Sequence, residues 1–224
     1  MITVDNVTKK YGQKIVLDDV SFKVDGGEFV SIVGASGAGK TTLIHAMICA
    51  TDIDSGKIKV DEYEVNKLGP KNIQEYRRKF GMVFQDFKLL PNQTVYENVA
   101  FALEVCGYDK DFIKKRVADV LKIVGLDEQK NHFPKQLSGG EKQRTAIARA
   151  LVHAPKLLFA DEPAGNLDPD NAIALAKLLL KINQSGTTII LATHNKDIVN
   201  TIKKRVITIE NGKIISDKKE SGYR

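Results

Sequence analysis

The sequence predicts an α/β fold with a parallel-sheet core, an antiparallel β subdomain and an inserted α-helical subdomain. Short apolar runs such as FGMVF, KLLFAD and TTIILAT alternate with longer stretches of helical periodicity, a pattern typical of a parallel sheet covered by helices. The chain opens with two runs that alternate apolar and polar residues, which favours half-buried antiparallel strands. Between residues 86 and 154 there are several helical patterns and no convincing strand, which indicates a helical insertion between two strands of the sheet.

The antiparallel strands and the first parallel strand are expected near the N-terminus. Residues 2–7 and 20–24 are the two alternating runs, and turn-rich sequence joins them. The next run, EFVSIV at residues 28–33, is almost continuously apolar, as expected for a buried parallel strand. From residue 41 to residue 50 the pattern becomes helical. A glycine-rich loop therefore lies between a predicted strand and a predicted helix.

Four later helices and a final hairpin complete the predicted fold. Helical periodicity covers residues 94–105, 111–124, 141–153 and 170–182. Asn211 and Gly212 separate two alternating runs, and both residue types tolerate the positive φ angles of a type I′ turn. We expect a single domain with a core of residues 1–85 and 156–218, a helical subdomain of residues 86–155 and a tail of residues 219–224.

The composition favours a soluble, cytoplasmic protein. No apolar run approaches the roughly 18 to 20 residues that cross a bilayer, and the N-terminus lacks the apolar segment of a secretory signal. Cys49 and Cys106 stand apart in apolar surroundings, so we expect buried, reduced thiols. The net charge of +6 comes from bases interleaved with acids, which argues against dedicated nucleic-acid binding. The mild basic excess would suit an anionic membrane surface, an acidic partner or simply solvated helix faces.

The stretch GASGAGKTT is the first candidate site. It fits the pattern G-x-x-x-x-G-K-[ST] between a strand and a helix, so backbone N–H groups can surround a phosphate at the helix N-terminus. Lys40 is expected to reach the β and γ phosphates of a nucleotide, and the Thr41 hydroxyl to ligate Mg²⁺. The predicted nucleotide contacts here are Gly34, Ala35, Ser36, Gly37, Ala38, Gly39, Lys40, Thr41 and Thr42.

Two adjacent carboxylates form the second candidate element. The stretch KLLFADEP places Asp161 at the end of an apolar strand, where it can hold the magnesium ion. Glu162 follows, and a carboxylate at this point can position or deprotonate an attacking water, a role worth roughly 10² to 10⁴ in rate. Beside the phosphate loop, these residues predict a P-loop nucleoside triphosphatase.

A second candidate anion site lies in the stretch QLSGGEKQR. Ser138, Gly139 and Gly140 stand directly in front of a predicted helix, whose N-terminus favours an anion. Ser138 can also simply cap its own helix, with Glu141 three residues later completing a capping box. Taken alone, the stretch favours this local capping role.

Taken with the other motifs, LSGGEKQR resembles the signature motif of the ABC-type ATPases, and the resemblance covers essentially the whole chain. It implies a RecA-like P-loop core that binds ATP and Mg²⁺ and hydrolyses ATP. It also implies an ATP-dependent homodimer with the two copies packed head to tail. In such a dimer, residues 138–140 of one subunit cap the γ-phosphate of ATP held by the phosphate loop of the other.

The resemblance assigns further residues individually. Tyr11 matches the aromatic residue that stacks on adenine, and Gln85, in VFQDF, matches the glutamine that senses magnesium and contacts a membrane partner. Asp168, in GNLD, matches the loop that crosses the dimer, and His194, in LATHN, matches the histidine that contacts the γ-phosphate. The implied catalytic residues are Lys40, Gln85, Glu162 and His194, and the implied magnesium ligands are Thr41, Gln85 and Asp161.

Residues 80–105 narrow the resemblance to one branch of the family. FQDFKLLP and TVYENVAFAL are similar to cell-division ATP-binding members, whereas ADEPAGNLD is shared with exporter ATPases. The cell-division branch implies an integral membrane partner that docks between Gln85 and Tyr96. It also implies a location at the cytoplasmic face of the membrane and ATP-driven control of cell-wall hydrolysis.

Three other interpretations remain open at this point. The chain could be the ATPase of a lipoprotein-release or macrolide-type exporter, which a partner with a translocation path would reveal. A family member that switches nucleic acid or ribosomes is expected to carry a second ATPase half or a long coiled insertion, and neither pattern is found. The stretch THNKD resembles a guanine-reading motif, but Asn195, Lys196 and Asp197 are contiguous, so the carboxylate would be out of register.

Overall fold

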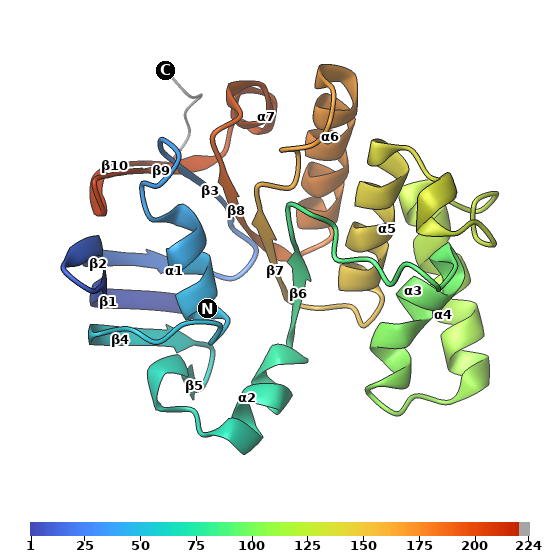
Figure 1. Ribbon diagram of the computed structural model, residues 1–224, viewed down its shortest axis with the longest axis horizontal. Coiled ribbons are helices and arrows are strands. Elements are labelled where there is room, and N and C mark those ends of the chain that lie inside the picture. Colours follow the sequence, from blue (N-terminus) through green and yellow to red (C-terminus); the bar gives the residue numbers. More distant parts are fainter. Residues whose placement is uncertain (220–224) are drawn as a thin grey trace.

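The computed structural model describes residues 1–219, so the predicted tail, apart from Lys219, lies outside the described residues. Its centre is a six-stranded sheet in the order β10-β9-β3-β8-β7-β6 (Figure 1). Strands β9, β3, β8, β7 and β6 are mutually parallel, and β10 is antiparallel to β9. The strands span Phe29–Val33 (β3), Phe80–Val83 (β6), Leu157–Asp161 (β7), Thr188–Thr193 (β8), Arg205–Glu210 (β9) and Lys213–Lys218 (β10). The predicted α/β class with a parallel core is confirmed.

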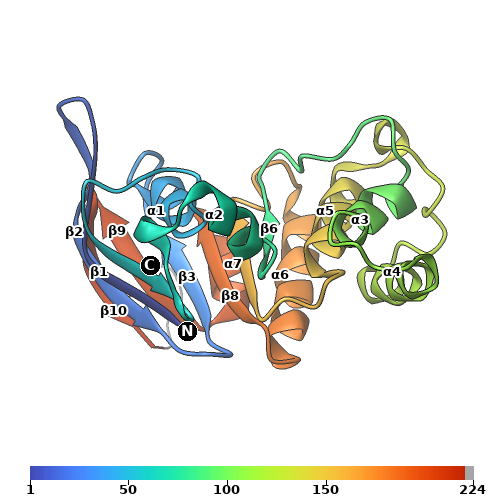
Figure 2. The ribbon, with the colours of Figure 1, turned by 90° about the horizontal axis from the view of Figure 1, so that it is seen from below.

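The central strands are apolar because helices cover both faces of the sheet. Every residue of β3, β7 and β8 is buried. Helix α1 (Lys40–Met47) packs between this sheet and a second one, and α6 (Pro169–Gln184) and α7 (Lys196–Ile202) lie on the other face (Figures 1 and 2). Because the strands are parallel, the carboxyl ends of β3, β7 and β8 meet at one edge.

The second sheet is antiparallel, in the order β2-β1-β4-β5. Its strands span Ile2–Tyr11 (β1), Lys14–Val24 (β2), Ser55–Val60 (β4) and Tyr63–Glu64 (β5). The strands predicted at residues 2–7 and 20–24 are therefore longer than expected, because backbone pairing continues into the polar hairpin end, where Tyr11 faces Lys14. The sequence-based prediction lacks β4, β5 and α2 (Pro70–Arg77), which are short and rich in charged residues.

Three helices occupy the chain between β6 and β7. They are α3 (Val95–Glu104), α4 (Lys110–Val124) and α5 (Gly139–Leu151), with a 3₁₀ turn at Pro134–Gln136 before α5 and another at Val65–Lys67 earlier in the chain. Thr94 begins α3 with a capping box, and Asp109 caps α4 by accepting from the N–H of Phe112. The four predicted helices are confirmed, with small differences at their ends, and α7 is additional.

The C-terminal hairpin has the predicted turn. Asn211 and Gly212 have φ angles of 48° and 80°, which is the left-handed pair that a type I′ turn requires. Cys49 and Cys106 are free thiols, but both are half-buried, so the expectation of buried cysteines is wrong. In the described part of the chain, no helix has the length and apolar character needed to span a bilayer.

Candidate nucleotide-binding site

The predicted phosphate loop connects β3 to α1, at the edge of the sheet where the parallel strands end. Gly39 has a φ of 108°, and a β-carbon built on it would lie 2.6 Å from the carbonyl oxygen of Val16. A β-carbon on Gly34 would lie 2.3 Å from the carbonyl oxygen of Ile209. Both positions therefore need glycine, because neighbouring backbone closes on the loop from β2 and β9. The tip of the loop, residues 35–37, is exposed.

Lys40 is held inside this loop. Only 5% of the residue is exposed, and Nζ donates to the carbonyl oxygens of Gly34 at 2.9 Å and Ala35 at 3.2 Å. Nζ also lies 3.3 Å from Oε1 of Glu162. The structure thus brings the predicted lysine of the loop and the predicted catalytic carboxylate together, although they are 122 positions apart in the sequence.

Thr41 and Asp161 form a second contact across the site. Oγ1 of Thr41 donates to Oδ1 of Asp161 at 3.0 Å. Burial raises the pKa of Asp161, and the hydrogen bond from Thr41 partly opposes that rise. A hydroxyl and a carboxylate are hard oxygen ligands, which is the donor set that Mg²⁺ takes together with phosphate oxygens and water. Among the described residues, no group of three or more acidic, histidine or cysteine side chains is placed to hold a metal ion.

Glu162 occupies a strained position immediately after β7. Its φ of 45° is in the left-handed region, which is uncommon for a residue with a side chain. Its N–H donates to the carbonyl oxygen of Ala192, and Oε1 lies 2.8 Å from Nδ1 of His194. The backbone N–H of His194 also donates to Oε2 at 3.3 Å. This strained turn therefore aims the carboxylate at Lys40 and His194, as is common at functional sites.

Gln85 lies beside the turn that follows Glu162. A β-carbon built on Gly165 would lie 2.9 Å from Nε2 of Gln85, so the amide rests against this glycine. The side chain of Asn166 donates to the carbonyl oxygen of Gln85 at 3.0 Å. The N–H of Gly165 in turn donates to the carbonyl oxygen of Glu162 at 3.0 Å. Gln85 thus contacts Gly165, which is hydrogen-bonded to the backbone of Glu162.

The signature residues form a separate corner of the molecule. Ser138 makes the capping box with Glu141, donating to its carboxylate at 2.7 Å and accepting from its N–H at 3.3 Å. These hydrogen bonds lower the pKa of Glu141. Gly140 packs against Asn171, one turn after Asp168, which caps α6. Asn171 donates two hydrogen bonds to that aspartate and lowers its pKa.

The two groups of predicted site residues are not adjacent within one chain. Lys40 begins α1, whereas Ser138 caps α5, and strands of the central sheet lie between these helices in both views (Figures 1 and 2). The capping box predicted for Ser138 is present, so the local role is confirmed. Contact between Ser138 and a nucleotide bound to a partner would require an assembly of two chains.

Tyr11 lies at the end of β1. Its side chain is 53% exposed, and its hydroxyl is within 3.3 Å of Oγ1 of Thr51. The Lys9 ammonium lies 5.1 Å from the centre of its ring. The ring is therefore accessible for stacking on a base, and its adenine contact stays a prediction.

Two residues that hold the backbone of the segment after Gln85 were not predicted from the sequence. Arg149 on α5 donates to the carbonyl oxygens of Phe87 at 2.9 Å and Lys88 at 2.6 Å. Asn98 is fully buried and bonds both the N–H and the carbonyl oxygen of Leu90. An arginine and an asparagine inside helices give no signal of such roles, because their partners are distant backbone groups.

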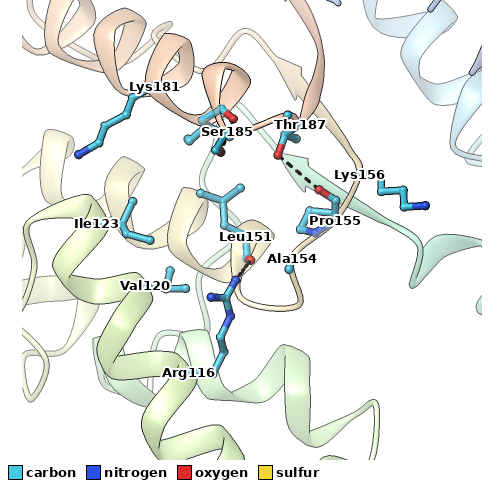
Figure 3. Close-up of a pocket in the computed structure, with 12 residues that line it drawn as sticks. Arg116, Val120, Ile123, Leu151, Ala154, Pro155, Lys156, Lys181, Ser185 and Thr187 are labelled. Atoms are coloured by element: carbon cyan, nitrogen blue, oxygen red, sulfur yellow. Dashed lines mark hydrogen bonds between the residues drawn. The ribbon is translucent and has the colours of Figure 1, made fainter. Parts of the chain in front are cut away.

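A cavity of about 420 Å³ lies away from the nucleotide site, near the amino ends of β7 and β8 (Figure 3). Two polar side chains on its lining bond backbone carbonyl oxygens. Arg116 donates to the carbonyl oxygens of Leu151 and Val152, and Thr187 donates to that of Pro155. The candidate catalytic residues lie at the opposite edge of the sheet. We therefore interpret this cavity as a packing gap between α4, α5 and α6.

Replacing Asp161 by asparagine is expected to stabilise the fold while removing most ATP hydrolysis. Because the pKa of Asp161 is raised in the folded chain, ionised Asp161 opposes folding. The stability that the protonated carboxyl contributes is therefore lost as the pH rises above the pKa of this group in the unfolded chain, about 3.9. The unfolding free energy of Asp161→Asn should therefore exceed that of the wild type by an amount that grows from pH 4 towards neutrality. Urea denaturation across this range measures the difference, with exposed Asp127→Asn as control. A difference independent of pH would contradict the assignment.

Comparisons with known proteins agree with this geometry. The model of the ABC transporter family matches residues 17–165. The cell division ATP-binding protein FtsE of Streptococcus pneumoniae serotype 2 is 50% identical, over 100% of this chain and 97% of that protein. The protein of the same name from Bacillus subtilis is 49% identical, over 100% and 98%. A dimeric post-hydrolysis structure of an ATP-binding cassette with ADP and Pi superimposes with a TM-score of 0.88 and 35% identity, over the whole of both chains.

The family match covers the phosphate loop, the signature stretch and the carboxylates after β7. The site geometry described above brings the phosphate loop and those carboxylates together on one edge of the sheet. The chain therefore belongs to the ABC transporter family and is an ABC ATPase.

Proposed function

We propose that this ATPase works in cell division, as the ATP-binding subunit of a complex with an integral membrane protein similar to FtsX. Two copies would clasp ATP and Mg²⁺ at the cytoplasmic face of the membrane. Closing and opening of this dimer would change the conformation of the membrane partner and so control cell-wall hydrolysis. The similarity to the cell division ATP-binding proteins, which extends over the full chain, supports this role over that of an exporter ATPase.

One observation carries the shared-site part of the proposal. Lys40, Glu162 and His194 form one cluster, and residues 138–140 and Asp168 form another. Strands of the central sheet lie between α1, which begins at Lys40, and α5, which Ser138 caps (Figures 1 and 2). A γ-phosphate at the first cluster therefore needs a second chain if the signature residues are to reach it. The dimeric form of the cassette bound to ADP and Pi supports this arrangement.

Each residue of the first cluster has a defined chemical role in this proposal. Lys40 binds the β and γ phosphates, and Glu162 orients the attacking water and accepts its proton. His194 holds the Glu162 carboxylate in place through the contact at 2.8 Å. Magnesium would be held by Thr41, Gln85 and Asp161, and it would supply positive charge that neutralises the phosphates.

The surface for the membrane partner is the segment from Gln85 to Tyr96. Phe87 and Lys88 have left-handed φ angles of 60° and 48°, and Arg149 holds the carbonyl oxygens of both. Fully buried Asn98 fixes the next part of the segment at Leu90. This segment contacts the catalytic turn through Gln85, so a partner that pushes on it could influence Glu162.

Placing two acidic residues on this surface, Phe87→Glu with Leu90→Glu, is expected to break the complex with the membrane partner. Both side chains are half-buried, and a carboxylate there would be desolvated when a partner covers it. The amount of partner that copurifies from membranes should fall at least about tenfold, which corresponds to a loss of about 1.4 kcal/mol in binding free energy. Basal ATP hydrolysis should stay within about twofold of wild type.

The control is Ile215→Glu, which places one carboxylate on the 59% exposed isoleucine of β10. Full retention of the partner by the Phe87 and Leu90 variant, with an unchanged melting temperature, would remove the docking assignment. A copurifying protein with a translocation path would instead indicate an exporter of the lipoprotein-release or macrolide type.

A further inference from the structure

A small cavity lies directly behind the signature residues, between the start of α5 and the start of α6. Its volume is about 210 Å³, and apolar side chains of α4 and α6 form most of its wall. The polar residues on its lining are Gln143 and Arg144 of α5 and Asn171 of α6. Gln143 follows Gly140 by three positions, so both residues are on the face of α5 that packs on α6.

Gln143 is an unusual residue in this position. Only 1% of it is exposed, yet neither Nε2 nor Oε1 has a hydrogen-bond partner among the described residues. The Nε atom of Arg144 is buried without a partner in the same way. A buried amide with both ends unpaired loses its hydrogen bonds to water on folding, so such groups are normally paired with protein or water. The cavity has room for several waters at about 30 Å³ each.

The cavity borders both segments that face the dimer partner in the proposed function. Gly140 belongs to the signature residues, and a β-carbon there would lie 2.5 Å from Oδ1 of Asn171. Asn171 in turn donates to the Asp168 carboxylate at 2.6 Å. Hydrogen bonds that run from Gln143 through water to Asn171 would therefore continue to Asp168.

We propose that Gln143 is a positioning residue for ATP hydrolysis, and this inference rests on the shared site of the proposed function. Its amide joins α5 to α6 through water held in the cavity. The signature residues and Asp168 then approach the partner's nucleotide as one rigid unit. Gln143 itself touches neither the nucleotide nor the reacting water.

The test replaces Gln143 by methionine, which has similar length and no hydrogen-bonding amide. The kcat for ATP hydrolysis should fall by about 5-fold to 100-fold, as expected when catalytic groups are misplaced by a fraction of an ångström. The KM for ATP and the nucleotide affinity of the single chain should stay within about twofold, because the phosphate loop lies elsewhere in the fold. The melting temperature should fall by about 2 °C or more, since the amide loses its water-mediated bonds.

Two further variants keep this test decisive. Gln184→Met makes the same change at the exposed end of α6 and should alter neither kcat nor the melting temperature. Ala174→Leu fills the cavity from the opposite wall with Gln143 intact, and it should also lower kcat by displacing water. If Gln143→Met does not fold, the Ala174 variant alone decides the matter.

The results differ if the Gln143 amide makes no hydrogen bonds to water. An unbonded amide is replaced by methionine at a gain in stability. A higher melting temperature with undiminished kcat in Gln143→Met, or full activity in Ala174→Leu, would overturn the proposal. The melting temperature is measured on the single chain, so it reports on the cavity even if ATP fails to induce a dimer, an outcome that would refute the proposed function instead.

Discussion

Lys40→Ala is expected to abolish ATP binding and hydrolysis. The ammonium group is buried inside the phosphate loop, where it already donates to two loop carbonyl oxygens and pairs with Glu162. Charge-assisted hydrogen bonds to phosphate contribute about 1.5 to 3 kcal/mol each, so losing two of them should weaken ATP binding by at least about 100-fold. Equilibrium titration with a fluorescent ATP analogue and a phosphate-release assay measure the two effects.

The same substitution has a cost for stability. Glu162 is only 9% exposed, and Lys40→Ala would leave its carboxylate without its cationic partner. The double variant Lys40→Ala with Glu162→Gln should recover much of the lost melting temperature without recovering ATP affinity. Lys177→Ala, on the exposed face of α6, is the matched control and should change neither property. Unchanged ATP affinity in Lys40→Ala would remove the phosphate-loop assignment.

Local patterns explain why part of the site could be predicted from sequence. Gly39, Lys40 and Thr41 follow a buried strand and open a helix, so strand, loop and helix together determine where their backbone N–H groups and side chains lie. Asp161 and Glu162 end a strand two places along the sheet from β3, and parallel strands end at the same edge. The contacts between Lys40 and Glu162, and between Thr41 and Asp161, follow from these two facts.

Features that depend on distant segments could not be predicted in the same way. Strands β4 and β5 are short and carry charged residues, and they form by pairing with neighbours, β4 with β1 and β5 with β4. The cavity next to Gln143 arises where α4, α5 and α6 meet, so no pattern in a single helix marks it. Arg149 looks like an ordinary helical arginine until its contact with the carbonyl oxygens of Phe87 and Lys88 is seen.

Ser138 shows a different limit. Its local sequence favours a helix cap over an anion site, although both use the free N–H groups of a helix start. The structure confirms the cap, with Glu141 as the reciprocal partner. The role in anion binding requires the surface of a second copy of the chain. A single sequence determines that contact only through the complementarity of the chain's surface to itself.

Glu162→Gln is expected to trap an ATP-bound dimer. The amide keeps the shape of the side chain and an oxygen near His194, but it cannot take a proton from the attacking water. Hydrolysis should therefore fall by roughly 10² to 10⁴. Removing a negative charge close to the γ-phosphate also lowers repulsion within the closed site, so the dimer should become tighter. Size-exclusion chromatography with light scattering, in ATP and Mg²⁺ and then in ADP, measures the association directly.

The control for this prediction follows from the shared geometry. Glu162→Gln combined with Lys40→Ala should stay monomeric in ATP, because no nucleotide is then held for residues 138–140 of the other chain to cap. A Glu162→Gln chain that remains monomeric at saturating ATP, while the wild type hydrolyses ATP at full rate, would show that one chain owns a complete site. The separation between the phosphate loop and the signature corner would then have to close by movement within a single chain, across the central sheet that lies between α1 and α5.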